Sequence, residues 1–173
     1  MNAAATRVRA WGNPGRRDDG LGPAFAGAIR DRGVADLAVS ADYQLQVEDA
    51  AELCGFARVL FVDADRAGPG PFRFHRLEPE AGGSGRPGFT SHGISPARVL
   101  RLGRELFGAA PEAWLMGIRG YDFDDFGEEL SAAARVNLEA AIAAVLEALA
   151  AGCGEGGAPR FAAVAAAEQR GAP

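Results

Sequence analysis

The segment Arg58–Asp65 constrains the fold more than any other part of the chain. Residues 59–62 are four consecutive large apolar residues, and the acid Asp63 follows them at once. A strand that is apolar on both faces is typical of a parallel sheet covered by helices on both sides. We therefore expect Asp63 to mark the point where a buried parallel strand emerges at its carboxyl end.

Strand-like and helix-like segments alternate along the rest of the chain. The expected strands cover residues 7–11, 35–44, 58–65, 71–77 and 113–118. The expected helices cover residues 23–32 and 47–54, and two more follow the caps Ser95 and Ser131. The apolar spacing of the last three helices predicts their buried faces: Val47, Ala51 and Cys54; Val99, Leu102 and Leu106, backed by Leu100 and Phe107; and Val136, Ala140, Ala143, Leu146 and Ala150. This order predicts an α/β domain, a three-layer α/β/α arrangement with a largely parallel, twisted five-stranded sheet. The segment 71–77 lies between prolines and is expected at an edge.

Length and composition limit the organisation and the partners. The chain has 173 residues, and its 18 basic and 23 acidic side chains give a net charge of −5. We expect one domain over residues 1–151 and a Gly/Ala-rich C-terminal tail, 152–173, of small functional importance. No basic stripe is available to bind nucleic acid. No apolar segment is long enough for a membrane helix or a signal peptide, so we expect a cytoplasmic monomer.

The first strand-to-helix turn, Trp11–Gly22, has the composition of a binding loop. It contains four glycines and the adjacent carboxylates Asp18 and Asp19. Glycine permits tight turns and close backbone approach, and ligands of open α/β sheets bind at the carboxyl ends of the strands. Two acids in this turn favour a cation. They also argue against a phosphate, and the glycine spacing of a nucleotide-binding loop is missing.

Three loops that can meet at this edge carry acidic or imidazole groups. They are Asp18 or Asp19 after the first strand, Asp63 after the third, and His92 just before a helix. Two carboxylates and one imidazole suit a borderline divalent metal, with positions left open for other ligands. Each residue also has an ordinary interpretation, as a helix cap, a solvated strand end or a loop residue. The two cysteines, Cys54 and Cys153, are expected to be free and structural.

Four motifs in this order resemble those of the hydrogenase maturation endopeptidases, over about residues 6 to 150. They are Gly12-Asn13 with Asp18-Asp19-Gly20-x-Gly22, then Val62-Asp63-Ala64, Thr90-Ser91-His92, and Ser131-x-x-Ala134-x-x-Asn137-Leu138. The block 42–49, together with Ile118-Arg119-Gly120, is similar to a subgroup that serves cytoplasmic, soluble hydrogenases.

The resemblance implies an activity and a set of roles. Enzymes of this family remove the C-terminal extension of a nickel-iron hydrogenase large-subunit precursor after nickel insertion. By this resemblance Asp19, Asp63 and His92 would contact a nickel that the substrate supplies, with no permanently bound cofactor. Asp19 or Asp63 is a candidate general base, in an aspartic-type or metal-assisted hydrolysis. The expected partner is that precursor.

Two alternatives remain open from the sequence. The acidic segment 122–129 could be a calcium loop, but its oxygens do not follow the EF-hand spacing, and a solvated loop or a surface that meets the substrate protein fits better. The second alternative is a non-catalytic hydrogenase assembly or chaperone module on the same fold, which only a cleavage assay distinguishes from the protease.

Overall fold

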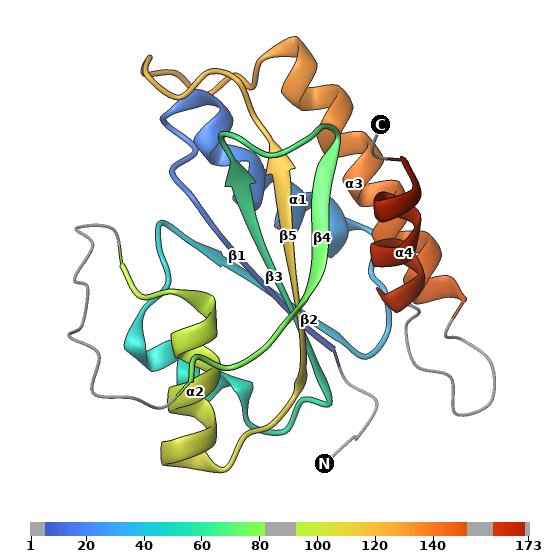
Figure 1. The fold of residues 1–173 in the computed structure, drawn as a ribbon. Coiled ribbons are helices and arrows are strands. Elements are labelled where there is room, and N and C mark those ends of the chain that lie inside the picture. Colours follow the sequence, from blue (N-terminus) through green and yellow to red (C-terminus); the bar gives the residue numbers. More distant parts are fainter. Residues whose placement is uncertain (1–5, 82–92, 152–160, 172–173) are drawn as a thin grey trace.

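The computed structural model describes residues 6–81, 93–151 and 161–171, and Figure 1 shows its fold. The strands are β1 (Thr6–Trp11), β2 (Leu37–Asp42), β3 (Arg58–Asp65), β4 (Phe72–Leu77) and β5 (Glu112–Arg119). The α-helices are α1 (Leu21–Asp31), α2 (Pro96–Phe107), α3 (Ala132–Ala150) and α4 (Phe161–Gly171). Two 3₁₀ helices, η1 (Arg17–Gly20) and η2 (Val47–Leu53), follow β1 and β2.

The strands form one sheet in the order β2-β1-β3-β5-β4. The pairs β1–β2, β1–β3 and β3–β5 are parallel, and the edge strand β4 runs antiparallel to β5. The largely parallel five-stranded sheet and the edge position of residues 72–77 are thus confirmed. Ala10 of β1 is paired with Val62 of β3. The residues that follow them, Trp11 and Asp63, therefore lie side by side near the carboxyl ends of the two strands.

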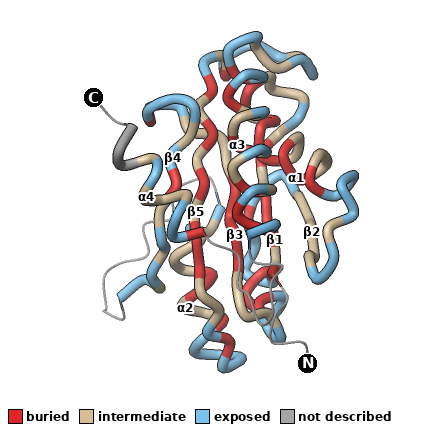
Figure 2. Tube along the Cα trace, turned by 90° about the vertical axis from the view of Figure 1, so that its right-hand side faces the viewer, coloured by how far each residue is buried: buried red, intermediate tan, exposed pale blue. Residues whose placement is uncertain are grey.

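Helices cover both faces of the sheet, which gives the three expected layers (Figures 1 and 2). Leu60 and Val62 of β3 belong to the core shared with α1, α3 and α4. Val59 and Phe61 point the other way, into the core shared with α2 and η2. All four side chains are fully buried. The apolar run on which the fold class was predicted therefore supplies both cores at once.

The predicted caps start both later helices. The Ser95 hydroxyl accepts a hydrogen bond from the N–H of Arg98 at 3.2 Å, and Ser131 accepts one from Ala134 at 3.2 Å. Each cap satisfies a backbone N–H that has no partner inside the first turn of its helix.

The buried faces of η2 and α2 differ from the prediction. Val47, Ala51 and Cys54, predicted on the buried face of a 47–54 helix, are exposed, because the segment winds as a 3₁₀ helix and buries other positions. In α2 the predicted core residues Leu106 and Phe107 are exposed, whereas Gly103 is buried. A Cβ on Gly103 would lie 3.0 Å from Leu53 of η2. The two helices therefore come closest at a glycine. Apolar spacing cannot predict this contact, because glycine has no apolar side chain.

The buried face of α3 is also shifted by one position from the predicted one. Val136 is exposed, and the buried line includes Ala134, Asn137, Ala141 and Val145. The helix is rich in alanine on all sides, so its apolar residues do not define one face. The buried side of this helix includes a polar residue, Asn137.

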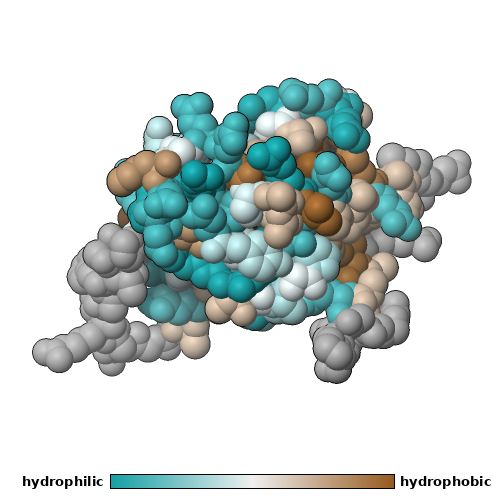
Figure 3. All heavy atoms as spheres, turned by 90° about the horizontal axis from the view of Figure 1, so that it is seen from above, coloured by the Kyte–Doolittle hydropathy of each residue, from teal (hydrophilic) through white to brown (hydrophobic). Residues whose placement is uncertain are grey.

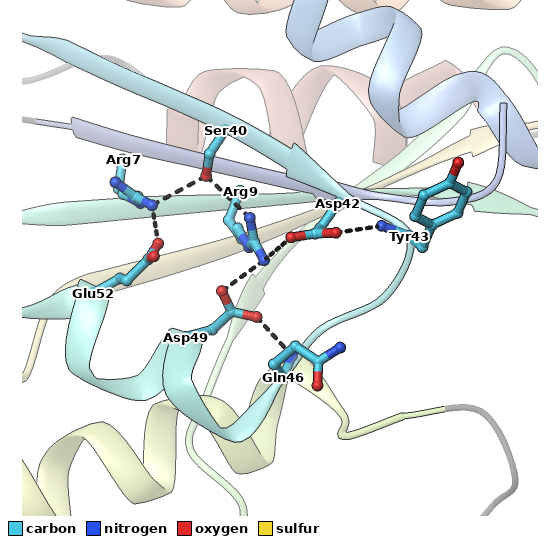
Figure 4. Close-up of polar contacts among 8 residues, drawn as sticks. All are labelled: Arg7, Arg9, Ser40, Asp42, Tyr43, Gln46, Asp49 and Glu52. Atoms are coloured by element: carbon cyan, nitrogen blue, oxygen red, sulfur yellow. Dashed lines mark hydrogen bonds and ion pairs between the residues drawn. The ribbon is translucent and has the colours of Figure 1, made fainter.

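A buried ion pair attaches η2 to the sheet (Figure 4). Arg9 of β1 and Asp49 of η2 are both buried, with Arg9 Nη2 2.7 Å from Asp49 Oδ1. The other oxygen of Asp49 accepts the N–H of Gln46 at 2.7 Å, which closes a capping box. Nearby, Arg7 pairs with Glu52. This charge pairing selects Asp49, and not Val47, for the inner side of η2.

Helix α4, within the segment predicted to be a tail, contributes to the core. Phe161, the first residue of α4, is 1% exposed. Its ring centroid lies 5.9 Å from that of Phe74 and 6.3 Å from that of Trp114. Cys153 and the glycine-rich segment 82–88 lie outside the described residues. Among the helices that are described, none is long and apolar enough to cross a membrane.

Candidate active site

The turn between β1 and α1 packs directly on the end of β1. A Cβ on Gly12, where φ is +139°, would lie 2.0 Å from the carbonyl oxygen of Asp19. A Cβ on Gly22 would lie 2.2 Å from the carbonyl oxygen of Trp11. Real side chains do not fit at such distances, so both positions require glycine. The predicted close approach of this loop is therefore a backbone-to-backbone contact, and it brings Asp19 to the end of the strand.

Asp19 and Asp63 come together at the carboxyl ends of neighbouring parallel strands. The backbone N–H of Asn13 donates to Asp19 Oδ2 at 3.0 Å, and that of Ala64 donates to Asp63 Oδ1 at 2.8 Å. The charge of Asp19 acts on the carboxyl of Asp63. Within the part of the chain that is described, neither carboxylate has a basic side chain as ion-pair partner. Counting only the described residues, this edge of the sheet holds two acids without a counter-charge.

The environment of Asp63 raises its pKa from 3.8 to about 7. Burial is the main cause, and the negative charges of Asp19 and Asp65 add to it. The N–H of Ala64 and the Trp11 side chain donate hydrogen bonds to Asp63 and act in the opposite direction, towards a lower pKa. A carboxyl group with a pKa near 7 can accept or release a proton at neutral pH. A bound cation would also stabilise the ionised form of this carboxyl group, in place of the proton.

Asp18 has a different surrounding and is a structural residue. It is fully buried, and its two oxygens accept the backbone N–H groups of Tyr121, Asp122 and Ser131 at 2.7–2.9 Å and the Ser131 hydroxyl at 2.7 Å. Burial raises the pKa of Asp18, but these hydrogen bonds outweigh it, so the pKa is lowered from 3.8. With its oxygens used in this way, Asp18 stabilises the loop after β5. Of the two adjacent acids, Asp19 is the one that is available to a ligand.

Two side chains contribute to this region although the sequence predicted no role for them. The Trp11 side chain, which donates to Asp63, shares its face of the sheet with Phe61, and their ring centroids lie 6.2 Å apart. Asn137 of α3 donates to the carbonyl of Arg119 at 2.9 Å and to the Tyr121 hydroxyl at 3.2 Å. The pairing of β1 with β3 places Trp11 beside Asp63, so a predicted register of these two strands would have identified this contact. Asn137 belongs to the motif that begins at Ser131, but no role was predicted for it.

The third predicted ligand, His92, lies outside the described residues. The chain resumes at Gly93, where a Cβ would lie 3.3 Å from the carbonyl oxygen of Leu45, in the segment after β2. Among the residues that are described, no group of three or more His, Cys, Asp or Glu side chains could hold a metal ion. The roles of Asp19, Asp63 and His92 towards a metal remain predictions.

The acidic segment 122–129 does not have the character of a calcium loop. Asp122 lies 3.5 Å from Arg17 Nε, and Asp124 lies 3.8 Å from Arg66 Nη1. Between them, Phe123 is buried, with the Arg66 guanidinium 4.2 Å from its ring centroid. Two of the acids thus have guanidinium partners, and an aromatic side chain fills the space between them.

The fold is that of the hydrogenase maturation proteases. The hydrogenase 2 maturation peptidase of a Thaumarchaeota archaeon is 22% identical, with a TM-score of 0.62 over 84% of this chain and 98% of that one. The nickel-iron hydrogenase maturation protease HycI of Thermococcus kodakarensis is 19% identical, with a TM-score of 0.66 over 87% and 95%. The hydrogenase maturating endopeptidase HybD of E. coli is 19% identical, with a TM-score of 0.63 over 84% and 92%. No protein-family model and no curated protein sequence matches the chain.

Proposed function

We propose that this protein is an endopeptidase that removes the C-terminal extension of a nickel-iron hydrogenase large-subunit precursor after nickel has been inserted. The solved structures of the same fold are named as hydrogenase maturation proteases, which supports the activity. The observation that carries the proposal is the pair Asp19 and Asp63, two carboxylates without a basic partner among the described residues. The predicted cytoplasmic location of this reaction stays a prediction.

The acid pair suits a metal that arrives with the substrate. Asp19, Asp63 and His92 offer oxygen and imidazole ligands and leave positions open for the groups that already hold the nickel. A protease of this kind needs no permanently bound cofactor. It binds the nickel-loaded precursor better than the nickel-free one, because the cation relieves the repulsion between the two carboxylates.

Asp63 is the candidate general base. Its pKa of about 7 places it near the pH at which a group can both take and return a proton. In the proposed reaction Asp63 accepts the proton of the attacking water and then returns it to the leaving amine. The scheme is compatible with an aspartic-type and with a metal-assisted cleavage, because in both an activated water attacks the peptide carbonyl.

The test is to incubate the protein separately with nickel-loaded and nickel-free large-subunit precursor and to measure the intact mass of the precursor. Loss of the C-terminal segment only in the nickel-loaded sample is expected. Asp63→Asn should abolish the loss, and Asp31→Asn, which changes an exposed acid at the end of α1, should leave it intact. Binding of the precursor without loss of mass would instead identify a non-catalytic assembly module.

A further inference from the structure

The segment Tyr121–Glu129, which joins β5 to the start of α3, is fixed to the turn that carries Asp19. Gly127 exchanges two backbone hydrogen bonds with that turn, accepting from Arg17 at 2.8 Å and donating to Gly15 at 2.9 Å. The Arg16 guanidinium donates to the carbonyl of Phe123 at 3.3 Å. Together with the hydrogen bonds that Tyr121 and Asp122 donate to the Asp18 carboxylate, these contacts place the segment beside the turn that carries Asp19.

This segment exposes an aromatic side chain although it buries another. Phe123 is buried, whereas Phe126 is 85% exposed and is the most exposed large apolar residue in the described part of the chain. The backbone on both sides of Phe126 is tied down, by Phe123 towards Arg16 and by Gly127 towards the turn. A partner that covers the ring would therefore pay little conformational entropy for ordering the loop.

The charges around Phe126 indicate what such a partner carries. Residues 121–129 contain five acids and no basic residue. Arg17 and Arg66 lie near Asp122 and Asp124, whereas Asp125, Glu128 and Glu129 are exposed and have no basic partner among the described residues. Figure 3 views the molecule from above, at the end where this segment lies, and hydrophilic side chains cover most of that face with small hydrophobic areas between them.

We propose that Phe126 and the acids beside it form a docking surface for the substrate protein, specifically for a basic segment with an apolar side chain close to the bond that is cut. The inference rests on the proposed function, since it takes the hydrogenase precursor as the partner. An aromatic anchor surrounded by complementary charges is a common arrangement for a binding hot spot. The surface would hold the precursor while its scissile bond reaches Asp19 and Asp63.

The experiment compares two variants with two matched controls. Phe126→Ala removes the aromatic ring, and the triple variant Asp125→Asn/Glu128→Gln/Glu129→Gln removes the unpaired charges. Leu106→Ala is the apolar control, because Leu106 is 63% exposed at the end of α2, just before the chain enters β5 at the opposite end of the sheet. The triple variant Asp31→Asn/Glu139→Gln/Glu147→Gln changes three exposed acids of α1 and α3.

For each protein, kcat and KM for cleavage of nickel-loaded precursor and the Kd for the same precursor are measured at low and high salt. Phe126→Ala should raise KM and Kd about tenfold and leave kcat unchanged. The acid variant should weaken binding at low salt and remove most of its salt dependence. Precursor in which Lys and Arg near the cleaved bond are changed to Gln should bind the wild-type protein as weakly as normal precursor binds the acid variant. Both controls should behave as the wild type.

The outcomes separate this inference from the proposed function. If the wild type cleaves and Phe126→Ala has an unchanged KM and Kd, the proposed docking surface is contradicted and the proposed protease activity is supported. If the wild type binds without cleaving and Phe126→Ala weakens that binding, the docking surface is supported and the protease activity is contradicted. If the wild type neither binds nor cleaves nickel-loaded precursor, both are overturned. If the precursor with Lys and Arg changed to Gln binds the wild-type protein as tightly as normal precursor does, the docking segment is not recognised by its basic charge, and that part of the proposal is wrong.

Discussion

The carboxylate of Asp18 accepts hydrogen bonds from both the backbone N–H and the hydroxyl of Ser131, each at 2.7 Å, although 113 positions separate the two residues. One buried side chain thus links the first turn of the chain to the start of α3. The same carboxylate holds the N–H groups of Tyr121 and Asp122. The loop after β5 therefore has its position set from the turn that carries Asp19.

Replacing Asp18 with Asn should destabilise the fold by roughly 2–4 kcal/mol, because the amide introduces donors where four donors already point and removes a buried charge that they stabilise. The folded pKa of Asp18 lies below 3.8, so its contribution is present at neutral pH and lost as the pH falls through the folded pKa. Urea unfolding at neutral and acid pH measures both effects. Asp31→Asn is the control, and equal stability of the two variants at neutral pH would contradict the structural role.

Asp63→Asn should abolish processing and yet raise stability at alkaline pH. The folded pKa is about 7 and the unfolded value 3.8, so the folded state holds the proton more tightly and loses stability as the pH rises between these values. Removing the charge should recover up to about 4 kcal/mol above pH 7 and almost nothing below the unfolded pKa. Thermal melts across this pH range provide the measurement. A variant that is no more stable than the wild type at alkaline pH would mean that the carboxyl of Asp63 is not desolvated.

Asp19→Asn should lower the pKa of Asp63, because the negative charge of Asp19 is one of the causes that raise it. The carbon chemical shift of the Asp63 carboxyl, followed by NMR as a function of pH, reports this directly. Asp31→Asn should leave the titration unchanged. An unaltered midpoint in Asp19→Asn would show that the two acids do not share one site.

Phe161→Ala should lower the free energy of unfolding by roughly 3–5 kcal/mol, since a buried ring packed against Phe74 and Trp114 leaves a cavity. Val136→Ala, at an exposed position of α3, should change it by less than about 0.5 kcal/mol. Denaturant unfolding of the two variants side by side tests whether α4 belongs to the cooperative core. Equal midpoints would mean that residues 161–171 are a dispensable tail.

The sheet could be predicted because its signals are local. The run at 58–65 becomes β3 with the predicted limits, and the turn 11–22 joins β1 to α1. Since parallel strand ends meet at one edge, chain order predicted that an acid of the first turn, Asp18 or Asp19, can lie close to Asp63. Their roles in catalysis and metal binding stay predictions.

Features that depend on distant contacts could not be predicted in this way. Whether Asp18 or Asp19 faces a ligand depends on Ser131 and the loop before it, which local composition does not contain. The inner side of η2 depends on an ion pair with Arg9. The Ala-rich C-terminal segment looked dispensable, because a single aromatic residue, Phe161, attaches it to the core.

The two glycines at positions 12 and 22 have a consequence for how the acid pair is assembled. They let the backbone of the turn contact the backbone at the end of β1 directly. No side chain lies between the two backbones at these contacts, so none can change the distance between them by changing its conformation. The separation of Asp19 and Asp63 then follows from the register of β1 against β3, which the buried cores on both faces hold. The two like charges are brought together during folding itself. The repulsion between them is thus already present in the free protein, where it contributes to the raised pKa of Asp63. Under the proposed function, a metal-loaded partner would relieve this repulsion on binding.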